Sequence, residues 1–331
     1  MSVRSHGESP HPSRAARPRR GVALLAALWL VVAIATVALQ FSLEAHERRA
    51  VGILISDRGI QRAAAVGALA LVQAKLDYAL RVAPTATTAA RLQSFDPWLD
   101  VDSTYTGTID VDSTEVQVQA HDLGEQLNIN QLTENDFQTF FSYLLKDYEK
   151  STQLAQSIMD WRDADSIPRP NGAERDAYIK AGMLGLPTNA PFREVEELRD
   201  VYGMTPDIYA LVSPYFTTRG TGFVNLNTAP APVLRTLPGM TDAILNTVLQ
   251  MRSQGRRISN VNDVLPPVSR STTANALRTR EQAQLNTRAT VETDIVELVI
   301  IARTGPQSQP TRLVADIRRS RGETAVSYKA W

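Results

Sequence analysis

The sequence of 331 residues contains no cysteine. This absence excludes disulfide bonds, thiolate metal sites and cysteine nucleophiles. Histidine is scarce, and no two of the four histidines have the spacing of a metal-binding pair: His6, His11, His46 and His121. The sequence also lacks a Gly-x-Ser-x-Gly element and a phosphate-binding loop. We therefore expect a protein that is not an enzyme.

The chain also has no overall excess of positive charge. Lysine and arginine together number 35, as do aspartate and glutamate. Residues 1–20 hold five arginines against the single Glu8, so the rest of the chain has 30 basic and 34 acidic residues. A surface that binds nucleic acid shows a basic excess. The charge pattern therefore argues against nucleic acid as a partner.

Long apolar runs are absent except for one near the N-terminus. From Val22 to Leu39 the chain has 18 residues of which Thr36 alone is polar. As a helix this run spans about 27 Å, close to the bilayer core of about 30 Å. Residues 1–20, which we expect to be disordered, place their arginines before it, which predicts a cytoplasmic leader and an exported body. A buried core helix is the alternative.

The boundary of the apolar run decides how it is processed. A secretory signal would be cleaved after the run, but the residues that follow, Gln40–Glu44, form a poor site. The break comes before it, at Arg20-Gly21-Val22, and resembles a prepilin peptidase site cut after Gly21. The resemblance implies that the apolar helix, with Trp29 and Leu30, stays on the mature protein as membrane anchor and assembly surface, with a methylated N-terminus.

Helical sequence continues to about residue 82, where Pro84 follows. This length is similar to the long N-terminal helix of pilin-like proteins, although a break at one of its glycines would give two separate helices. Most pilins have glutamate as the fifth mature residue, where this chain has Ala26. A carboxylate in lipid is costly unless it is paired. Its absence either weakens the pilin interpretation or indicates a special subunit with no partner above it.

Alternating apolar and polar residues predict strands on both sides of a long, largely helical stretch. Residues 106–120 predict a hairpin that turns at residues 112–114, and residues 291–302, 313–319 and 324–331 predict three further strands. We expect an α+β fold: a pilin-like long helix packed on a small antiparallel sheet, with a large inserted α-helical domain resembling helix-hairpin-helix (SAM-like) units. The predicted parts are 1–21 (leader), 22–39 (membrane segment), 40–122 (remaining helix and first strands), 123–285 (insert) and 286–331 (last strands).

The insert repeats one sequence pattern. Leu127-Asn128-Ile129-Asn130 opens it, and residues 224–230, Val-Asn-Leu-Asn-Thr-Ala-Pro, repeat the alternation near its end. Asparagine side chains bond to backbone at turns and helix starts, so we expect caps here. Leu237-Pro238-Gly239-Met240 predicts a helical hairpin. Such a turn can hold a phosphate, but a purely structural hairpin is the interpretation we favour.

In combination, these motifs resemble the type II secretion system protein K family, the large minor pseudopilins. The match runs from residue 19 to about residue 330. The motifs that carry it are Arg20-Gly21 with Ala26, residues 127–130, 160–165 with 168–178, 195–198 with 203–204, and 223–230 with 237–240.

The resemblance implies a place and a set of partners. It implies a Gram-negative inner-membrane protein with one span and a periplasmic body. Its implied partners are minor pseudopilins of the I and J types, the major pseudopilin, the prepilin peptidase and secretion substrates. The implied role is to form the pseudopilus tip, start assembly and support export across the outer membrane. The alternatives are a membrane-anchored helix-hairpin-helix DNA-binding protein and a minor tip pilin of a type IV pilus.

An acidic loop is the one candidate metal site. Its carboxylates are Asp160, Asp163, Asp165, Glu174 and Asp176. Calcium takes six to eight oxygen ligands, and the loop does not follow the EF-hand pattern. The family resemblance and an extracytoplasmic setting both favour calcium, as a cofactor that is not required. The alternative is that these carboxylates cap helices and face solvent.

Overall fold

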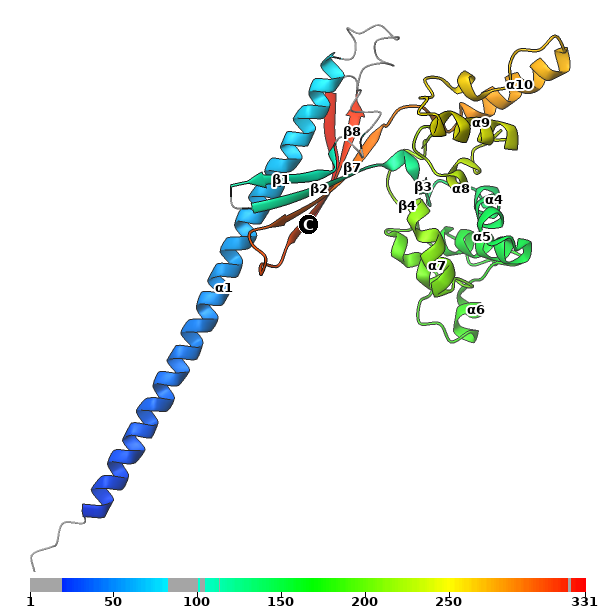
Figure 1. Ribbon diagram of the computed structural model, residues 1–331. Coiled ribbons are helices and arrows are strands. Elements are labelled where there is room, and N and C mark those ends of the chain that lie inside the picture. Colours follow the sequence, from blue (N-terminus) through cyan, green and yellow to red (C-terminus); the bar gives the residue numbers. More distant parts are fainter. Residues whose placement is uncertain (1–19, 83–100, 102–104, 113, 321–322) are drawn as a thin grey trace, which may run out of the picture. The chain divides into compact units, whose positions relative to one another are not determined.

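The computed structural model describes residues 20–82, 101, 105–112, 114–320 and 323–331. The chain divides into two compact units, with the boundary between Arg58 and Gly59. Helix α1 runs from Arg20 to Val82 and continues through Gly52, Gly59 and Gly67, so it is a single helix (Figure 1). The predicted leader, except for Arg20 and Gly21, lies outside the described residues.

The second unit contains one five-stranded antiparallel sheet in the order β1-β2-β7-β8-β9. The strands are β1 Gly107–Val111, β2 Thr114–Asp122, β7 Ile295–Arg303, β8 Thr311–Ser320 and β9 Glu323–Ala330. The hairpin and the three C-terminal strands are thus present as predicted. Strand β7 starts at Ile295, later than the expected residue 291. The preceding Ala289–Thr290 form a separate strand, β6, that pairs with β5 (Val224–Asn225).

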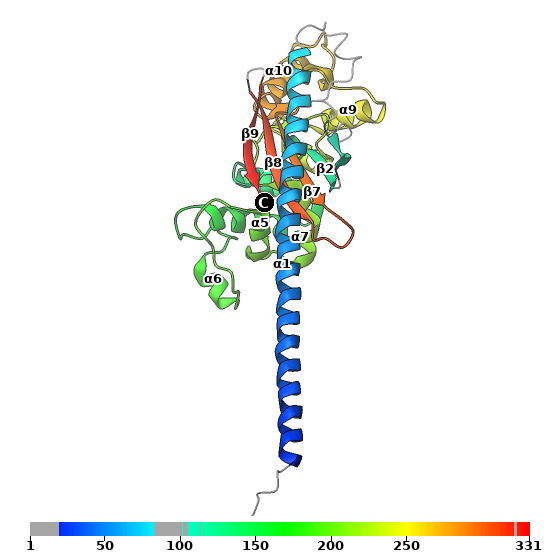
Figure 2. The same ribbon diagram turned by 90° about the vertical axis from the view of Figure 1, so that its left-hand side faces the viewer.

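The C-terminal part of α1, residues 59–82, packs on one face of this sheet (Figures 1 and 2). Strand β2 alternates strictly between buried and exposed residues, so its apolar side chains all reach the helix side. Alanines on α1 allow the helix to lie close to the strands. The shared core includes Ala64, Ala65, Ala68, Val72, Leu76, Val116, Val118, Leu298, Ile300, Leu313 and Ile317.

A large α-helical insert joins strands β2 and β7, which are neighbours in the sheet. Its helices are α4 Glu134–Leu145, α5 Tyr148–Arg162, α6 Arg175–Lys180, α7 Pro206–Val212, α8 Ala231–Leu234, α9 Asp242–Ser253 and α10 Thr272–Leu285. Short 3-10 turns connect them: η2 Leu123–Glu125, η3 Val195–Asp200, η4 Ser213–Tyr215 and η5 Val261–Val264. The predicted α+β fold with an inserted α-domain is confirmed, and β6 extends the paired structure of the insert beyond the predicted limit at residue 285.

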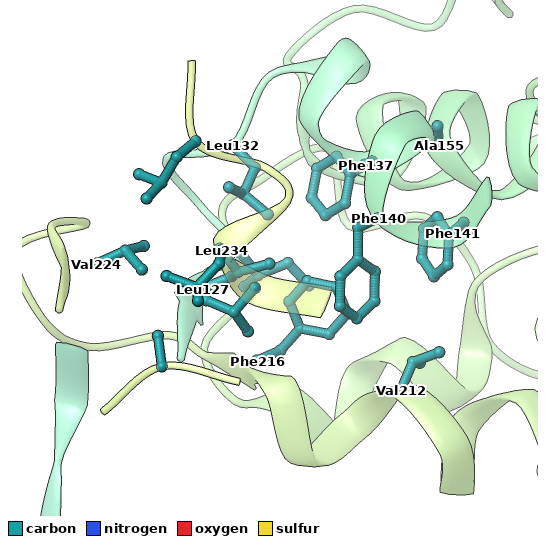
Figure 3. Packing of buried hydrophobic residues seen from close by; sticks show 14 of the residues in the cluster. Leu127, Leu132, Phe137, Phe140, Phe141, Ala155, Val212, Phe216, Val224 and Leu234 are labelled. Carbon is teal, nitrogen blue, oxygen red and sulfur yellow. The ribbon is translucent and has the colours of Figure 1, made fainter. Parts of the chain in front are cut away.

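The core of the insert is built around phenylalanines from α4 and the short strand β4, Phe216–Thr217 (Figure 3). The ring centroids of Phe140 and Phe216 are 4.9 Å apart, and those of Phe140 and Phe141 are 5.4 Å apart in an edge-on contact. Helix α4 begins at a capping box formed by Thr133 and Asp136. The N-cap is therefore Thr133, not an asparagine of the preceding motif.

The two asparagine motifs form the same local structure. Each lies on a two-residue strand in a parallel pair, β3 (Leu127–Asn128) with β4 and β5 with β6. In the first, the amide of Asn130 donates to the side chain of Asn128 at 3.0 Å. In the second, the amide of Asn227 donates to the side chain of Asn225, also at 3.0 Å. The insert therefore contains an internal structural repeat, which the repeated sequence pattern indicated.

An arginine completes each repeat. Arg162, at the end of α5, donates from its guanidinium to the carbonyls of Ile129 and Leu132. Arg252, at the end of α9, donates in the same way to the carbonyls of Thr228 and Ala229. Burial lowers the pKa of both guanidinium groups. Each repeat thus ties the end of its second helix to its own asparagine motif.

A single arginine connects the insert to the face of the sheet that points away from α1. Arg219 follows β4 and forms ion pairs with Glu297 on β7 and Asp316 on β8. Its guanidinium carbon also lies 4.6 Å from the ring centroid of Tyr328 on β9. The Asp316 side chain is only 4% exposed. Three adjacent strands therefore bind one side chain of the insert.

Candidate functional site

The predicted processing and assembly residues lie in the first turns of α1. Gly21, Val22 and Ala26 are all helical. Trp29 and Leu30 are exposed, as are the other large apolar side chains from Leu24 to Leu43. Among the described residues, α1 is the helix that is long and apolar enough to cross a membrane. Its length and composition are consistent with a single-pass inner-membrane anchor.

Three of the five predicted metal ligands come together in the loop after α5. Asp163, Asp165 and Glu174 each bring a carboxylate oxygen to within 4.8 Å of the other two. Asp163 is the C-cap of α5, and Glu174 is the residue before α6. Asp176 lies in the first turn of α6, outside this group. The acid cluster is defined here as Asp163, Asp165 and Glu174.

Asp160, the remaining predicted ligand, is fully buried beside the cluster and already has partners. Arg169 donates to it twice, from its side-chain Nη1 to Oδ1 at 2.6 Å and from its backbone amide to Oδ2 at 3.1 Å. Gly172 closes over the same carboxylate, because a Cβ at this position would overlap Oδ2. Asp160 therefore organises the loop, and its oxygens are occupied.

Glu174 is the most unusual member of the cluster. Its side chain is 94% buried, since only 6% of the residue is exposed, and neither carboxylate oxygen has a well-formed hydrogen bond. Burial raises its pKa, and the charges of Asp160, Asp163 and Asp165 raise it further. The amide of Arg175 offsets only part of this effect. A buried carboxylate without partners is costly unless it is protonated or binds a cation.

The remaining oxygens of the cluster also point to a cation. Oδ1 of Asp163 is buried and has no hydrogen-bond partner, whereas Oδ2 accepts from Arg169. One oxygen of Asp165 accepts from the amide of Ile167, and the side chain is exposed. Only oxygen donors are present, which suits a hard cation such as calcium and not a soft metal. Because Asp163 and Glu174 both have buried oxygens without a hydrogen-bond partner, the acid cluster fits a calcium ion.

Arg169 is the functional residue that sequence reasoning missed. It lies between Pro168 and Pro170, and its guanidinium contacts Asp160, Asp163 and Glu134. A basic residue inside an acidic loop was the available signal. The sequence alone could not show which carboxylates it would contact.

The second repeat serves as an internal comparison. The residues that follow Arg252, from Ser253 to Arg257, contain no carboxylate, and the next one along the chain is Asp263. The same helix–arginine arrangement therefore occurs once with the acid cluster and once without it. The residues directly after the arginine are therefore acidic in the first repeat and not in the second.

The hairpin at Leu237–Met240 does not present an open phosphate site. Gly239 has a φ of +80°, as the turn requires. A Cβ built at Gly239 would come within 2.9 Å of Gln284 Cβ and 3.0 Å of the Glu281 carbonyl oxygen. The turn is therefore covered by α10, which favours the structural role expected for it.

Comparisons with known proteins match this architecture. The family model "Type II secretion system (T2SS), protein K" matches residues 125–220 in its first part and 224–288 in its second part. These two matches coincide with the two repeats of the insert.

Similar sequences carry the same description. A type II secretion system protein K from Pectobacterium carotovorum is 31% identical over 157 residues, which cover 43% of this chain and 48% of that protein. One from Dickeya chrysanthemi is 27% identical over 304 residues, covering 75% of this chain and 81% of that protein. The chain thus spans about half the length of the first relative and most of the second.

One solved structure is also similar. It is the crystal structure of the GspK-GspI-GspJ complex from enterotoxigenic Escherichia coli, with a TM-score of 0.61. The match covers 82% of this chain and 96% of the other, at 17% sequence identity, and it bears on the fold alone.

Proposed function

Because the chain belongs to the type II secretion system protein K family, we propose that it is a minor pseudopilin at the tip of the pseudopilus. In this role it associates with minor pseudopilins of the I and J types, lies above the major pseudopilin and starts assembly in the inner membrane. Through the tip it supports protein export across the outer membrane. The role is structural, and no catalytic activity is proposed.

The observation that carries this proposal is the large insert between two adjacent strands of a pilin-like sheet. The sheet and the C-terminal part of α1 form a compact pilin-like core, and about half of the chain lies in the insert. An insert of this size would obstruct a further subunit stacked above. The similar structure, whose title names a GspK-GspI-GspJ complex, supports the choice of partners.

The apolar N-terminal helix supports the membrane part of the proposal. Its large side chains from Leu24 to Leu43 are exposed, which suits lipid before assembly and neighbouring helices afterwards. Prepilin peptidase would cut after Gly21, leaving Val22 as the mature N-terminus and the body in the periplasm. Mass measurement with and without the peptidase tests this step. A mature N-terminus elsewhere would contradict it.

Co-expression of the full chain with I-type and J-type minor pseudopilins tests the partner assignment. We expect a complex of defined stoichiometry that survives purification in detergent. The Ala26→Glu variant restores the carboxylate found in most pilins, and Ala27→Glu is its matched control one position away. If a subunit above is absent, Ala26→Glu should assemble no better than the control. Failure of the native chain to associate with either partner would contradict the proposal.

We also propose that the acid cluster binds one calcium ion. The partnerless oxygens of Glu174 and Asp163 are its support. Calcium would hold the loop between α5 and α6 and neutralise its buried charge. Further oxygens from water or backbone would complete the coordination.

A crossover in thermal stability tests the calcium proposal. In chelator, Glu174→Gln should melt above the native chain, because it removes a buried charge. In calcium, it should melt below, because a ligand is lost. Asp176→Asn is the control and should behave as the native chain in both conditions. Identical melting of the native chain with calcium and with chelator would contradict the site.

A further inference from the structure

Arg169 places a positive charge directly beside the acid cluster. Its guanidinium contacts three carboxylates, one of them in the cluster: Nη1 lies 2.6 Å from Asp160 Oδ1 and 2.5 Å from Asp163 Oδ2, and Nε lies 3.4 Å from Glu134 Oε2. These carboxylates come from α4 and from the end of α5. Arg169 thus ties the loop to both helices without any metal.

The same contacts divide the carboxylate oxygens into two sets. Arg169 occupies both oxygens of Asp160 and one of Asp163. The other oxygen of Asp163 and both oxygens of Glu174 are buried and have no partner. The arginine therefore determines which oxygens remain for a cation, and it places a positive charge next to them.

We infer that Arg169 is a built-in counter-cation that keeps the loop folded without calcium and lowers the calcium affinity of the acid cluster. The inference rests on the metal site proposed above. In calcium-binding proteins the calcium affinity depends on the charge of the ligands and the rigidity of the site. The inference identifies Arg169 as a residue that controls this affinity.

Removing the Arg169 guanidinium should lower the stability of the calcium-free protein and raise its calcium affinity. Removing the guanidinium leaves Oδ1 of the buried Asp160 without its charged partner, although Oδ2 keeps the backbone amide of residue 169, and this destabilises the calcium-free protein. It also removes a repulsive charge near the bound ion and frees oxygens of Asp160 and Asp163 as ligands. Calcium then contributes more binding free energy, and part of the lost stability returns on binding.

Calcium titration of the full chain in detergent micelles tests the inference, with calorimetry and melting as readouts. Arg169→Gln should bind calcium on the order of tenfold more tightly than the native chain and melt at a lower temperature in chelator. Arg169→Lys keeps a charge but cannot bond two carboxylates with one planar fork, so it should lie between the two.

A double variant guards against a folding failure of Arg169→Gln. The double variant Asp160→Asn with Arg169→Gln lacks the Asp160 carboxylate, which is both the buried charge left by Arg169→Gln and the calcium ligand that it frees. Its calcium-free stability should therefore rise above that of Arg169→Gln, and its affinity should fall back toward the native value. A merely structural arginine would change the stability of these variants without this reversal in affinity.

The outcomes separate the inference from the site on which it rests. Suppose that Arg169→Gln binds calcium with the native affinity or more weakly, and that Glu174→Gln does not bind calcium. This result overturns the role of Arg169 and leaves the calcium site intact. If Glu174→Gln binds calcium as tightly as the native chain does, the proposed site is wrong, and this inference fails with it. Failure of both the native chain and Arg169→Gln to bind millimolar calcium overturns both.

Discussion

Replacing Arg219 by alanine should destabilise the body of the protein by about 3–5 kcal/mol, the cost of leaving one partner of a buried ion pair alone. Asp316 is 4% exposed and Glu297 is 17% exposed, so the guanidinium stands in for most of the water that the Asp316 carboxylate would otherwise contact. Loss of the contact with the Tyr328 ring adds about 0.5–1 kcal/mol.

The pH dependence of this loss follows from Asp316. Burial raises the pKa of its carboxyl above the ordinary value, and Arg219 counteracts part of that rise. Without Arg219 the pKa rises further. A carboxyl with a raised folded-state pKa destabilises the protein above that pKa and ceases to do so when it is protonated. The deficit of the variant should therefore be full above the raised folded-state pKa of Asp316 and shrink as the pH falls through it toward the ordinary aspartate value.

Urea denaturation followed by tryptophan fluorescence, on the full chain in micelles, measures the free energy of unfolding. Asp316→Asn in the Arg219→Ala background should recover much of the lost stability, because the lone buried charge is gone. The reasoning is refuted if Arg219→Ala costs less than about 1 kcal/mol, or if its deficit does not shrink as the pH is lowered toward the ordinary aspartate pKa.

Three further predictions concern the insert. Gly172→Ala should destabilise the native chain, since its Cβ would overlap the Asp160 carboxylate, and should weaken calcium binding at the proposed site by displacing the loop that Asp160 organises; melting and calorimetry check both. Phe140→Ala should cost about 3–5 kcal/mol in urea denaturation, because the ring is fully buried in the core; a loss below 1 kcal/mol would contradict that packing. In chelator, the stability advantage of Glu174→Gln over the native chain should be full above the raised folded-state pKa of Glu174, shrink as the pH falls through it, and vanish below the ordinary glutamate pKa, where the carboxyl is neutral in the folded and the unfolded chain. An advantage that is independent of pH would count against a buried charge at this position.

The elements that follow from local periodicity could be predicted from the sequence. The uninterrupted apolar and alanine-rich run gave α1, and strict alternation gave β2. Both signals depend only on neighbouring residues. The repeated asparagine motif likewise pointed to the internal repeat, although the sequence suggested helix caps where the structure has turns and short parallel strand pairs.

The candidate site was only partly predictable, for a different reason. Asp163, Asp165 and Glu174 lie together because the loop folds back at Gly172, while Asp160 is taken by Arg169. Five carboxylates in one acidic stretch look equivalent in sequence. Which of them keep unoccupied oxygens depends on where one arginine places its guanidinium, and side-chain contacts of this kind are set by tertiary packing.

The position of the insert has a topological consequence. Strands β2 and β7 are antiparallel neighbours, and Asp122 pairs with Val296 at the point where the chain leaves and re-enters the sheet. The two strands are thus a β-hairpin whose loop is an entire domain. Closing so long a loop in an unfolded chain costs on the order of 3 kcal/mol more than a tight turn. A folded insert that brings its own ends together removes that cost, so the sheet can form as if the strands were consecutive, and a short turn in place of the insert should leave a pilin-like fold of ordinary size.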